Sequence, residues 1–494
     1  MELTIFIIIL PLVTAFLLGI LYFFDNKISN SVVIISSLLN SSLIILVIQR
    51  ASRQPLIYSP GEWGDLGINL IVDSYSSLML SIIALLLPLT ILYSLKYVQE
   101  NSIKFFSLVF LMTAGVTGMV ITADLFNLFV FFEITSITSY ALVAIPKRDS
   151  SIEGAFKYAV LGTISGFFIL LAIIFCYQAT GQLGIPQVAA EFGNIPAFLQ
   201  GTIITFFIFG FGLKFALVPL HAWLPDSYSG APLPYNVLSS ALVIKASLMV
   251  LFRILYLLPK TALFSENITA ILIYWGVFTF LVAHITAYQQ KSIIRLLAYS
   301  SIAQIGYITI GMSLATEAGI IGGSFHLLNH AIMKACLFFT AGIIITYCDS
   351  RKVKDFKGFG YQQPLIAVTF IFGGLAIIGL PPFNGFVSKW FLIIAALEAD
   401  YTIAAFFIPV GSFLSLTYYL RIFKQFYSGP DNKLTGKKHE KNNSSLLNLK
   451  LPAYLLAILC LLIGVFPALP LQLINSIPQF LLERINYITM IPGG

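Results

Sequence analysis

The sequence has 494 residues, of which 58% are hydrophobic and only 10% are charged. A soluble protein carries about 25% charged residues, so this chain has too little charge to cover a water-facing surface. The composition excludes a typical soluble enzyme and predicts an all-α polytopic membrane protein. The basic residues behind the net charge of +7 lie in short loops, so membrane topology explains the charge better than a nucleic-acid partner does.

Apolar runs of the length that crosses a bilayer as a helix, ~20 residues, occur about fourteen times along the chain. The run 364–398 is too long and too rich in Pro and Gly for one straight helix, so we predict one interrupted span there. The stretch 471–488 is a candidate interfacial segment. In chain order, the approximate cores of the spans are 3–22, 31–49, 72–94, 104–122, 124–145, 155–178, 201–220, 235–258, 268–288, 293–313, 321–347, 364–398, 401–427 and 451–470.

The basic residues of the loops support this count. Short cytoplasmic loops of membrane proteins carry an excess of Lys and Arg, and a miscounted helix would scramble that bias downstream of the error. The even-numbered loops hold little beyond Arg50, Arg53 and Lys260, so we expect the odd loops on the cytoplasmic side and both termini outside. The odd loops hold Lys27, Lys96, Lys104, Lys147, Arg148, Lys291, Arg295, Arg351, Lys352, Lys354, Lys357, Lys433, Lys437, Lys438 and Lys441.

Two spans, the seventh and the twelfth, contain residues that break helices. Proline removes a backbone donor and clashes with the preceding turn, and short broken helices in corresponding places indicate ion or substrate sites in transporters. The two spans are five helices apart and cross in opposite directions, as two inverted five-helix repeats would require. Two independent proline kinks are the alternative. The breaking residues are Pro219, Pro225, Pro232 and Pro234 in the first segment, and Pro381, Pro382 and Gly385 in the second.

The inverted repeat divides the chain into four parts. Residues 1–100 form helices 1–3, and residues 101–260 form the first repeat, helices 4–8. Residues 261–428 form the second repeat, helices 9–13. Residues 429–494 hold a polar cytoplasmic loop and helix 14.

Few ionisable side chains lie inside the expected spans. Each mid-helix charge costs about 2.5–3.5 kcal/mol on insertion scales, and four lysines with a glutamate exceed about 10 kcal/mol, comparable to the stability of a domain. Lys157 and His284 lie near helix ends, where the side chains can snorkel to water. The central set is Glu133, Lys214, Lys245, His326, His330, Lys334 and Lys389.

This set suits proton transfer. Desolvation makes a buried lysine release its proton more readily, and a nearby carboxylate opposes this, so movement of the carboxylate or its proton switches the lysine. His326, His330 and Lys334 stand at i, i+4 and i+8, on one helical face. Two histidines at that spacing could bind zinc, but a lysine on the same face repels a cation. A satisfied pair of core histidines is a further alternative.

We expect no cofactor, no metal site and no catalytic residue. The four cysteines, Cys176, Cys336, Cys348 and Cys460, are scattered singly, so they indicate neither a disulfide framework nor a metal centre. Asp124 and Asp226 flank a span and a break, and we interpret them as cap or loop residues.

Six stretches resemble the antiporter-like subunits shared by Mrp-type cation/proton antiporters, respiratory complex I and membrane-bound hydrogenases. They occur in the family's order, from the fifth to the twelfth span. They are "DLFNLFVFFEITSITSYALVA", "KYAVLGTISG", "GLKFALVPLHAWLPDSYSGAP", "VIKASLMVLFRI", "HLLNHAIMKACLFFTAG" and "GLPPFNGFVSKW".

The resemblance implies fourteen helices with two inverted units and assigns roles to the buried set. Glu133 is the carboxylate paired with Lys214, and Lys245 is the central relay lysine. The His326–Lys334 stretch links the two halves. Lys389 is the terminal residue of the second half-channel. Some relatives carry Glu there, and "PPFNGFVSKW" resembles the D subunit of Mrp antiporters and the matching hydrogenase subunit more than core complex I chains.

The leading hypothesis is therefore a proton-translocating subunit of a multisubunit Na+/proton antiporter in the prokaryotic cell membrane. The alternative is the proton-pumping subunit of a redox complex such as complex I or a hydrogenase, in which this chain catalyses no redox step itself. A membrane transferase using His326 and His330 fits the buried charges poorly. Expected partners are other membrane subunits, protons, Na+ and the lipid bilayer, with no nucleic acid.

Overall fold

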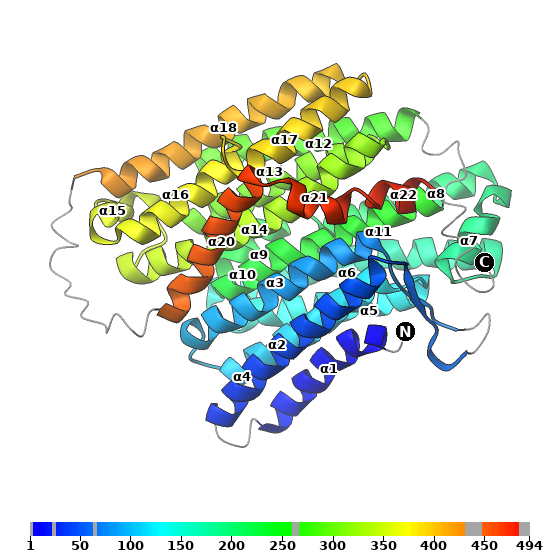
Figure 1. The fold of residues 1–494 in the computed structure, drawn as a ribbon, viewed down its shortest axis with the longest axis horizontal. Coiled ribbons are helices and arrows are strands. Elements are labelled where there is room, and N and C mark those ends of the chain that lie inside the picture. The colour runs from blue at the N-terminus through cyan, green and yellow to red at the C-terminus, as the bar shows by residue number, and fades with distance from the viewer. Residues whose placement is uncertain (1–2, 22–25, 63–66, 259–265, 430–446, 484–494) are drawn as a thin grey trace.

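The computed structural model describes residues 3–21, 26–62, 67–258, 266–429 and 447–483. Long helices dominate it and form one elongated bundle (Figure 1). The N-terminal helices α1, α2 and α4 line one long side of the bundle, and α12, α17 and α18 line the opposite side. The prediction of an all-α polytopic membrane fold is confirmed.

The first six long helices follow the expected spans closely. They are α1 (Leu3–Leu21), α2 (Asn26–Ala51), α3 (Ser74–Tyr97), α4 (Ser102–Ile121), α5 (Leu125–Ala144) and α6 (Asp149–Thr180). The later ones are α8 (Ala197–Lys214), α9 (Trp223–Gly230), α10 (Leu233–Leu238), α11 (Ile244–Leu257), α12 (Glu266–Gln289), α13 (Ile293–Ser313), α14 (Glu317–Cys348), α16 (Pro364–Ile378), α17 (Asn384–Glu398), α18 (Thr402–Tyr427) and α20 (Leu447–Val465). Short helices α7 (Ile185–Glu191) and α15 (Phe359–Gln362) lie in connections.

Within the described residues, thirteen helical segments are long and apolar enough to cross a membrane. The interrupted pair α16–α17 is the twelfth span in chain order, and adding it brings the total to the predicted fourteen. Most of the polar 429–450 loop lies outside the described residues. We call the end of the bundle that carries the odd loops, from the α3–α4 connection to the α14–α15 connection, the basic end.

Neighbour relations repeat along the chain with an offset of five spans. Helix α6 packs against α5, α8 and α9, and α14 packs in the same way against α13, α16 and α17. Likewise, α4 packs on α5 and α12 packs on α13. Since five spans reverse the direction of crossing, the two units are inverted with respect to each other, each with one broken helix.

The first break lies between α8 and α9, so the continuous helix ends at Lys214, six residues before the expected end at 220. Pro219 lies in the break, where the indole of Trp275 donates to the carbonyl of Val218 at 2.6 Å. The indole of Trp223 donates to the carbonyl of Leu213 at 2.9 Å. These indoles satisfy carbonyls that the break removes from the helix, as a membrane interior requires.

The second break lies between α16 and α17 and contains Pro381 and Pro382. The C-cap of α16 is Gly379, whose φ of +85° is the left-handed conformation that glycine adopts without a steric cost. Both broken helices pack on a continuous neighbour, α6 or α14.

The eighth span is not a uniform α-helix. A π-helical turn, Ser239–Val243, separates α10 from α11. Such turns often occur at functional sites, and nothing in the hydropathy pattern predicted this one.

Two further elements, a pair of short strands and the C-terminal helices, lie outside the repeats. Strands β1 (Leu56–Tyr58) and β2 (Leu70–Val72) pair antiparallel, with Leu56 opposite Val72. The C-terminal helices α21 (Ala468–Ile474) and α22 (Ile477–Leu482) cross the front of the bundle in Figure 1 and contact α3 and α14. These two helices include the first part of the candidate interfacial stretch 471–488.

Candidate functional site: a row of buried charges

Glu133 occupies the middle of α5 and is half-buried. It lies against Gly166 of the neighbouring helix α6, where an added Cβ would lie 2.5 Å from the carboxylate Oε1. Gly166 therefore makes the space that the carboxylate occupies. Among the described residues Glu133 forms no ion pair within 4.0 Å, although it is close enough to Lys214 to interact electrostatically.

Lys214 is the last residue of α8, directly before the first break, and its side chain is buried. The ammonium donates to the hydroxyl of Ser136 on α5 at 2.7 Å. It also lies over the rings of Phe132, Tyr140 and Tyr158, 4.8–5.2 Å from their centroids. Ser136 stands one turn beyond Glu133, so a small movement of Lys214 along α5 exchanges a hydroxyl partner for a carboxylate.

Buried hydroxyl groups occupy the region between Lys214 and the π-helical turn. Tyr228 donates to the hydroxyl of Ser239 at 3.2 Å. The hydroxyls of Tyr158 and Tyr235 are buried without a hydrogen-bond partner among the described residues. Tyr235 lies close to both Tyr158 and Ser239. Sequence analysis did not select these residues, because tyrosine and serine in an apolar helix carry no charge signal.

Lys245 follows the π-helical turn and is completely buried. Its ammonium donates to the backbone carbonyl of Ser240 within that turn. The shifted hydrogen-bond register of the turn thus provides an acceptor five residues before the lysine. Lys245 also interacts electrostatically with His326, His330 and Lys334 across the interface with α14.

The three polar residues on α14 differ in their partners. His326 is held on both sides, by Ser388 Oγ at 2.9 Å and Gln304 Oε1 at 3.0 Å. Lys334 donates to the carbonyl of Leu297 at 3.0 Å. His330, between them, has no hydrogen-bond partner for either ring nitrogen among the described residues, so a fully satisfied histidine pair does not describe this helix.

Lys389 on α17 bridges the second break. Its ammonium donates to the carbonyls of Ile377 and Ile378, at 2.9 and 3.0 Å, and to Ser412 Oγ at 2.9 Å. The two carbonyls belong to the C-terminal end of α16, where a cation is favoured by the helix dipole. Lys389 follows Ser388, the partner of His326, so the row of polar groups continues from α14 into α17.

Lys157 and His284 have different environments, although both were expected to snorkel. Lys157 is partly exposed and pairs with Glu153 at 2.5 Å and with Asp226 at 2.7 Å. His284 is fully buried, with Tyr418 OH at 3.1 Å and Tyr307 OH at 3.3 Å. The snorkelling prediction for His284 is wrong, because α13 and α18 cover it with tyrosines.

The two acidic residues interpreted as caps also differ. Asp124 is the N-cap of α5 and accepts from the backbone N–H of Asn127 at 2.6 Å. Asp226 lies inside α9 and pairs with Arg295 as well as with Lys157. It therefore links the first repeat to α13 of the second repeat at the basic end.

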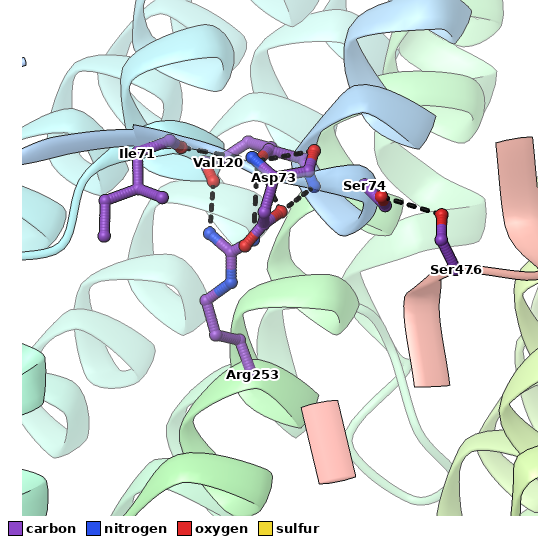
Figure 2. A network of polar contacts seen from close by, with 7 residues as sticks. Ile71, Asp73, Ser74, Val120, Arg253 and Ser476 are labelled. Carbon is purple, nitrogen blue, oxygen red and sulfur yellow. Dashed lines mark hydrogen bonds and ion pairs between the residues drawn. The ribbon is translucent and has the colours of Figure 1, made fainter. Parts of the chain in front are cut away.

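A buried ion pair that the sequence pattern did not predict lies at the end opposite the basic end. Figure 2 shows Arg253 of α11 reaching Asp73, the N-cap of α3, with Nη2–Oδ distances of 2.8 Å, and the carbonyl of Val120 at 2.7 Å. Beside it, Ser476 of the C-terminal segment bonds Ser74 at 2.8 Å. Asp73 and Arg253 lie near helix ends, where a charged residue is common and does not indicate a functional site.

These contacts arrange titratable groups in order through the interior of the bundle, from α5 to α17. The chemistry available to them is the binding and release of protons by Lys, His and Glu. In the described part of the chain, no three His, Cys, Asp or Glu side chains converge to hold a metal ion.

Two inverted units with broken helices, and cationic groups aligned between them, define the antiporter-like class of membrane subunits. The chain belongs to the NADH:quinone oxidoreductase/Mrp antiporter transmembrane family, whose model matches residues 122–415. The matched region contains every member of the buried set.

Individual relatives come from both branches of the family. The chain is 33% identical to the N subunit of the NADH-quinone oxidoreductase of Desulforudis audaxviator, over 94% of this chain and 95% of the relative. It is 28% identical to the D subunit of the Na(+)/H(+) antiporter of Alkalihalophilus pseudofirmus, over 94% of each.

Solved structures show the same division. A chain of the archaeal membrane-bound sulfane sulfur reductase superimposes with a TM-score of 0.92 at 32% identity and 99% coverage of both chains. A chain of the Mrp complex from Dietzia sp. superimposes with a TM-score of 0.89 at 25% identity and full coverage of both.

Proposed function

We propose that this chain is the proton-translocating subunit of a multisubunit monovalent cation (Na+)/proton antiporter. The observation that carries the proposal is the row of buried ionisable side chains from Glu133 to Lys389, which we call the buried row. A membrane protein retains costly interior charges where they serve transport. The similarity to the D subunit of an Na(+)/H(+) antiporter over nearly the whole chain supports the antiporter branch.

The residues of the buried row divide into three groups along the proposed path of the protons. Glu133 and Lys214 form the switch of the first half-channel, with Ser136 as the alternative partner of the lysine. Lys245, His330, His326 and Lys334 form the relay between the halves. Lys389 is the end of the second half-channel. The buried tyrosine and serine hydroxyls beside the π-helical turn supply the proton path from the switch to Lys245.

The surface around Glu133 supports assembly with other membrane subunits. Exposed apolar side chains flank it on α5 and α6, including Ile137 at 60% and Phe167 at 61% exposure. A neighbouring subunit that covers this face would lie beside the half-buried carboxylate. The relatives of known structure are themselves chains of multisubunit complexes.

Orientation and domain division complete the proposal. The concentration of Lys and Arg at one end supports an orientation with that end in the cytoplasm and both termini outside, in a prokaryotic inner membrane. The division into residues 1–100, 101–260, 261–428 and 429–494 separates the N-terminal helices, the two repeats and the C-terminal segment.

A second candidate function is proton pumping within a redox-driven complex. It is favoured by the 33% identity to an NADH-quinone oxidoreductase subunit and by the TM-score of 0.92 to a chain of a respiratory complex. Under this alternative the buried row also translocates protons, and electron transfer elsewhere in the complex drives the translocation.

The identity of the subunits that copurify with the chain separates the two candidates. Small membrane subunits alone support the antiporter, whereas subunits with iron–sulfur or flavin cofactors support the redox pump. Transport itself is tested by reconstituting the purified complex into vesicles and following internal pH after a Na+ gradient is imposed. Absence of Na+-dependent proton movement from a complex that lacks redox subunits would contradict the antiporter proposal.

A further inference from the structure

A cationic cavity of about 450 Å³ opens at the basic end, where the α12–α13 loop, the α14–α15 connection and α18 meet. Four of its seven lining residues are Lys or Arg, and none is Asp or Glu. The lining residues are Gln290, Lys291, Lys352, Val353, Lys354, Arg421 and Gln425. We call it the α12–α18 cavity.

Backbone hydrogen bonds fix the floor of the α12–α18 cavity. The N–H of Val353 donates to the carbonyl of Lys291 at 3.0 Å, and the N–H of Ile293 donates to the carbonyl of Arg351 at 2.9 Å. The guanidinium of Arg421 donates to the carbonyls of Tyr288 and Gln290, at 2.8 and 2.6 Å. These hydrogen bonds hold the α12–α13 loop, the α14–α15 connection and α18 together, although the cations that they carry repel one another.

The cations of this cavity have no anionic partner in the described part of the chain. Among the described residues, Lys291, Lys352 and Lys354 form no ion pair. The acidic residue nearest in sequence, Asp355, accepts a hydrogen bond from Ser350 at 2.6 Å. Like charges gathered without a counter-charge repel one another, so binding an anion in the cavity relieves that repulsion.

An apolar face leads from this cavity toward the membrane. On α12, Ile285 and Tyr288 are 52% and 54% exposed, and on α18, Leu420 is 49% exposed. The two helices pack together, and Arg421 lies over the ring of Tyr288 at 5.7 Å. Exposed tyrosines beside cations are typical of the level of lipid headgroups.

We propose that the α12–α18 cavity binds the phosphate headgroup of an anionic phospholipid, whose acyl chains lie on the exposed face of α12 and α18. Basic pockets between transmembrane helices are suited to such headgroups. An acidic segment outside the membrane would match the charge of the cavity alone, whereas a phospholipid matches both the cavity and the apolar face below it. Lys352 and Lys354 lie in the connection that follows α14, the helix that carries His326, His330 and Lys334. The bound headgroup therefore ties α14 to α12 and α18.

The test is a titration of the purified, full-length chain in neutral detergent with phosphatidylglycerol, with bound lipid counted by native mass spectrometry. The double variant Lys291→Gln/Lys354→Gln removes two charges from the cavity. The control, Lys96→Gln/Lys147→Gln, removes two exposed charges from the same end outside it. At about 1 kcal/mol for each cation near an anionic headgroup, the cavity variant should bind about 30-fold more weakly.

Two further arms identify the ligand. Phosphatidylcholine, which carries no net charge, and inorganic phosphate, which carries no acyl chain, should each compete poorly with phosphatidylglycerol. Wild-type affinity in the cavity variant, or an equal loss in the control, would overturn the site. Inorganic phosphate that competes as well as the lipid would overturn the role of the apolar face. An acidic peptide that displaces the lipid at equal concentration would favour a protein occupant and overturn the lipid.

Discussion

Replacing Lys214 by Met separates transport from stability more cleanly than any other change in the buried row. Methionine is unbranched and keeps most of the apolar volume of the lysine side chain but cannot hold a proton. The ammonium is buried, donates one hydrogen bond to Ser136 and lies over three aromatic rings. The variant therefore removes a defined set of contacts.

The structure gives the magnitude of the stability change. A hydrogen bond from a charged group contributes about 1.5–3 kcal/mol, and desolvated ring contacts contribute about 2 kcal/mol. Against these, a charge in mid-membrane costs about 2.5–3.5 kcal/mol. Because the terms largely cancel, Lys214→Met should change the free energy of unfolding by no more than about 2.5 kcal/mol, which corresponds to a few degrees in Tm.

Transport should respond very differently. Vesicles with the Lys214→Met complex should show Na+-dependent proton movement no faster than vesicles without protein, because the switch has lost its titrating group. The control is Lys157→Met, which removes a partly exposed cation from the neighbouring helix and should retain transport. A Lys214→Met complex that transports at half the wild-type rate or more would refute the assignment of Lys214 to the proton route.

Three other predictions concern neighbouring contacts and the missed ion pair. Glu133→Gln, which keeps shape but loses charge, should fold normally and abolish proton-coupled flux in the same vesicle assay; unchanged flux would remove the carboxylate from the mechanism. Gly166→Ala places a Cβ 2.5 Å from the present Oε1 position and should lower flux by displacing Glu133, while Gly201→Ala, with nothing within 4 Å, should behave as wild type. Asp73→Asn or Arg253→Gln alone should lower stability by about 3–5 kcal/mol, because each removes one partner of a buried ion pair; the double variant should melt higher, and equal Tm values for single and double variants would contradict the coupling.

Hydropathy and loop charge predicted the span count, and the proline residues predicted both breaks, because those features depend on local composition. Contacts between distant segments were not predictable in the same way. His284 was misjudged from its position late in a helix, since its burial depends on Tyr307 and Tyr418 on other helices. The pairing of Asp73 with Arg253 joins residues 180 positions apart, which a single sequence does not reveal.

The buried set itself was recognisable because charge in an apolar helix is conspicuous. Its geometry was less accessible. The π-helical turn before Lys245 changes which carbonyl meets the ammonium, and hydropathy carries no record of such a turn. Ser136, the present partner of Lys214, is an uncharged residue in an ordinary position on α5.

Lys389 has a further consequence for mechanics. Its ammonium has three N–H donors, and all three are used, two on carbonyls of α16 and one on Ser412. A neutral amine has only two N–H groups, so loss of the proton leaves one acceptor without a donor and turns a lone pair toward an oxygen. The same side chain fastens the half-helix before the break to the one after it. Under the proposed proton route, protonation of Lys389 would therefore control how firmly the two half-helices are joined, and each proton that passes would loosen and tighten that contact in turn.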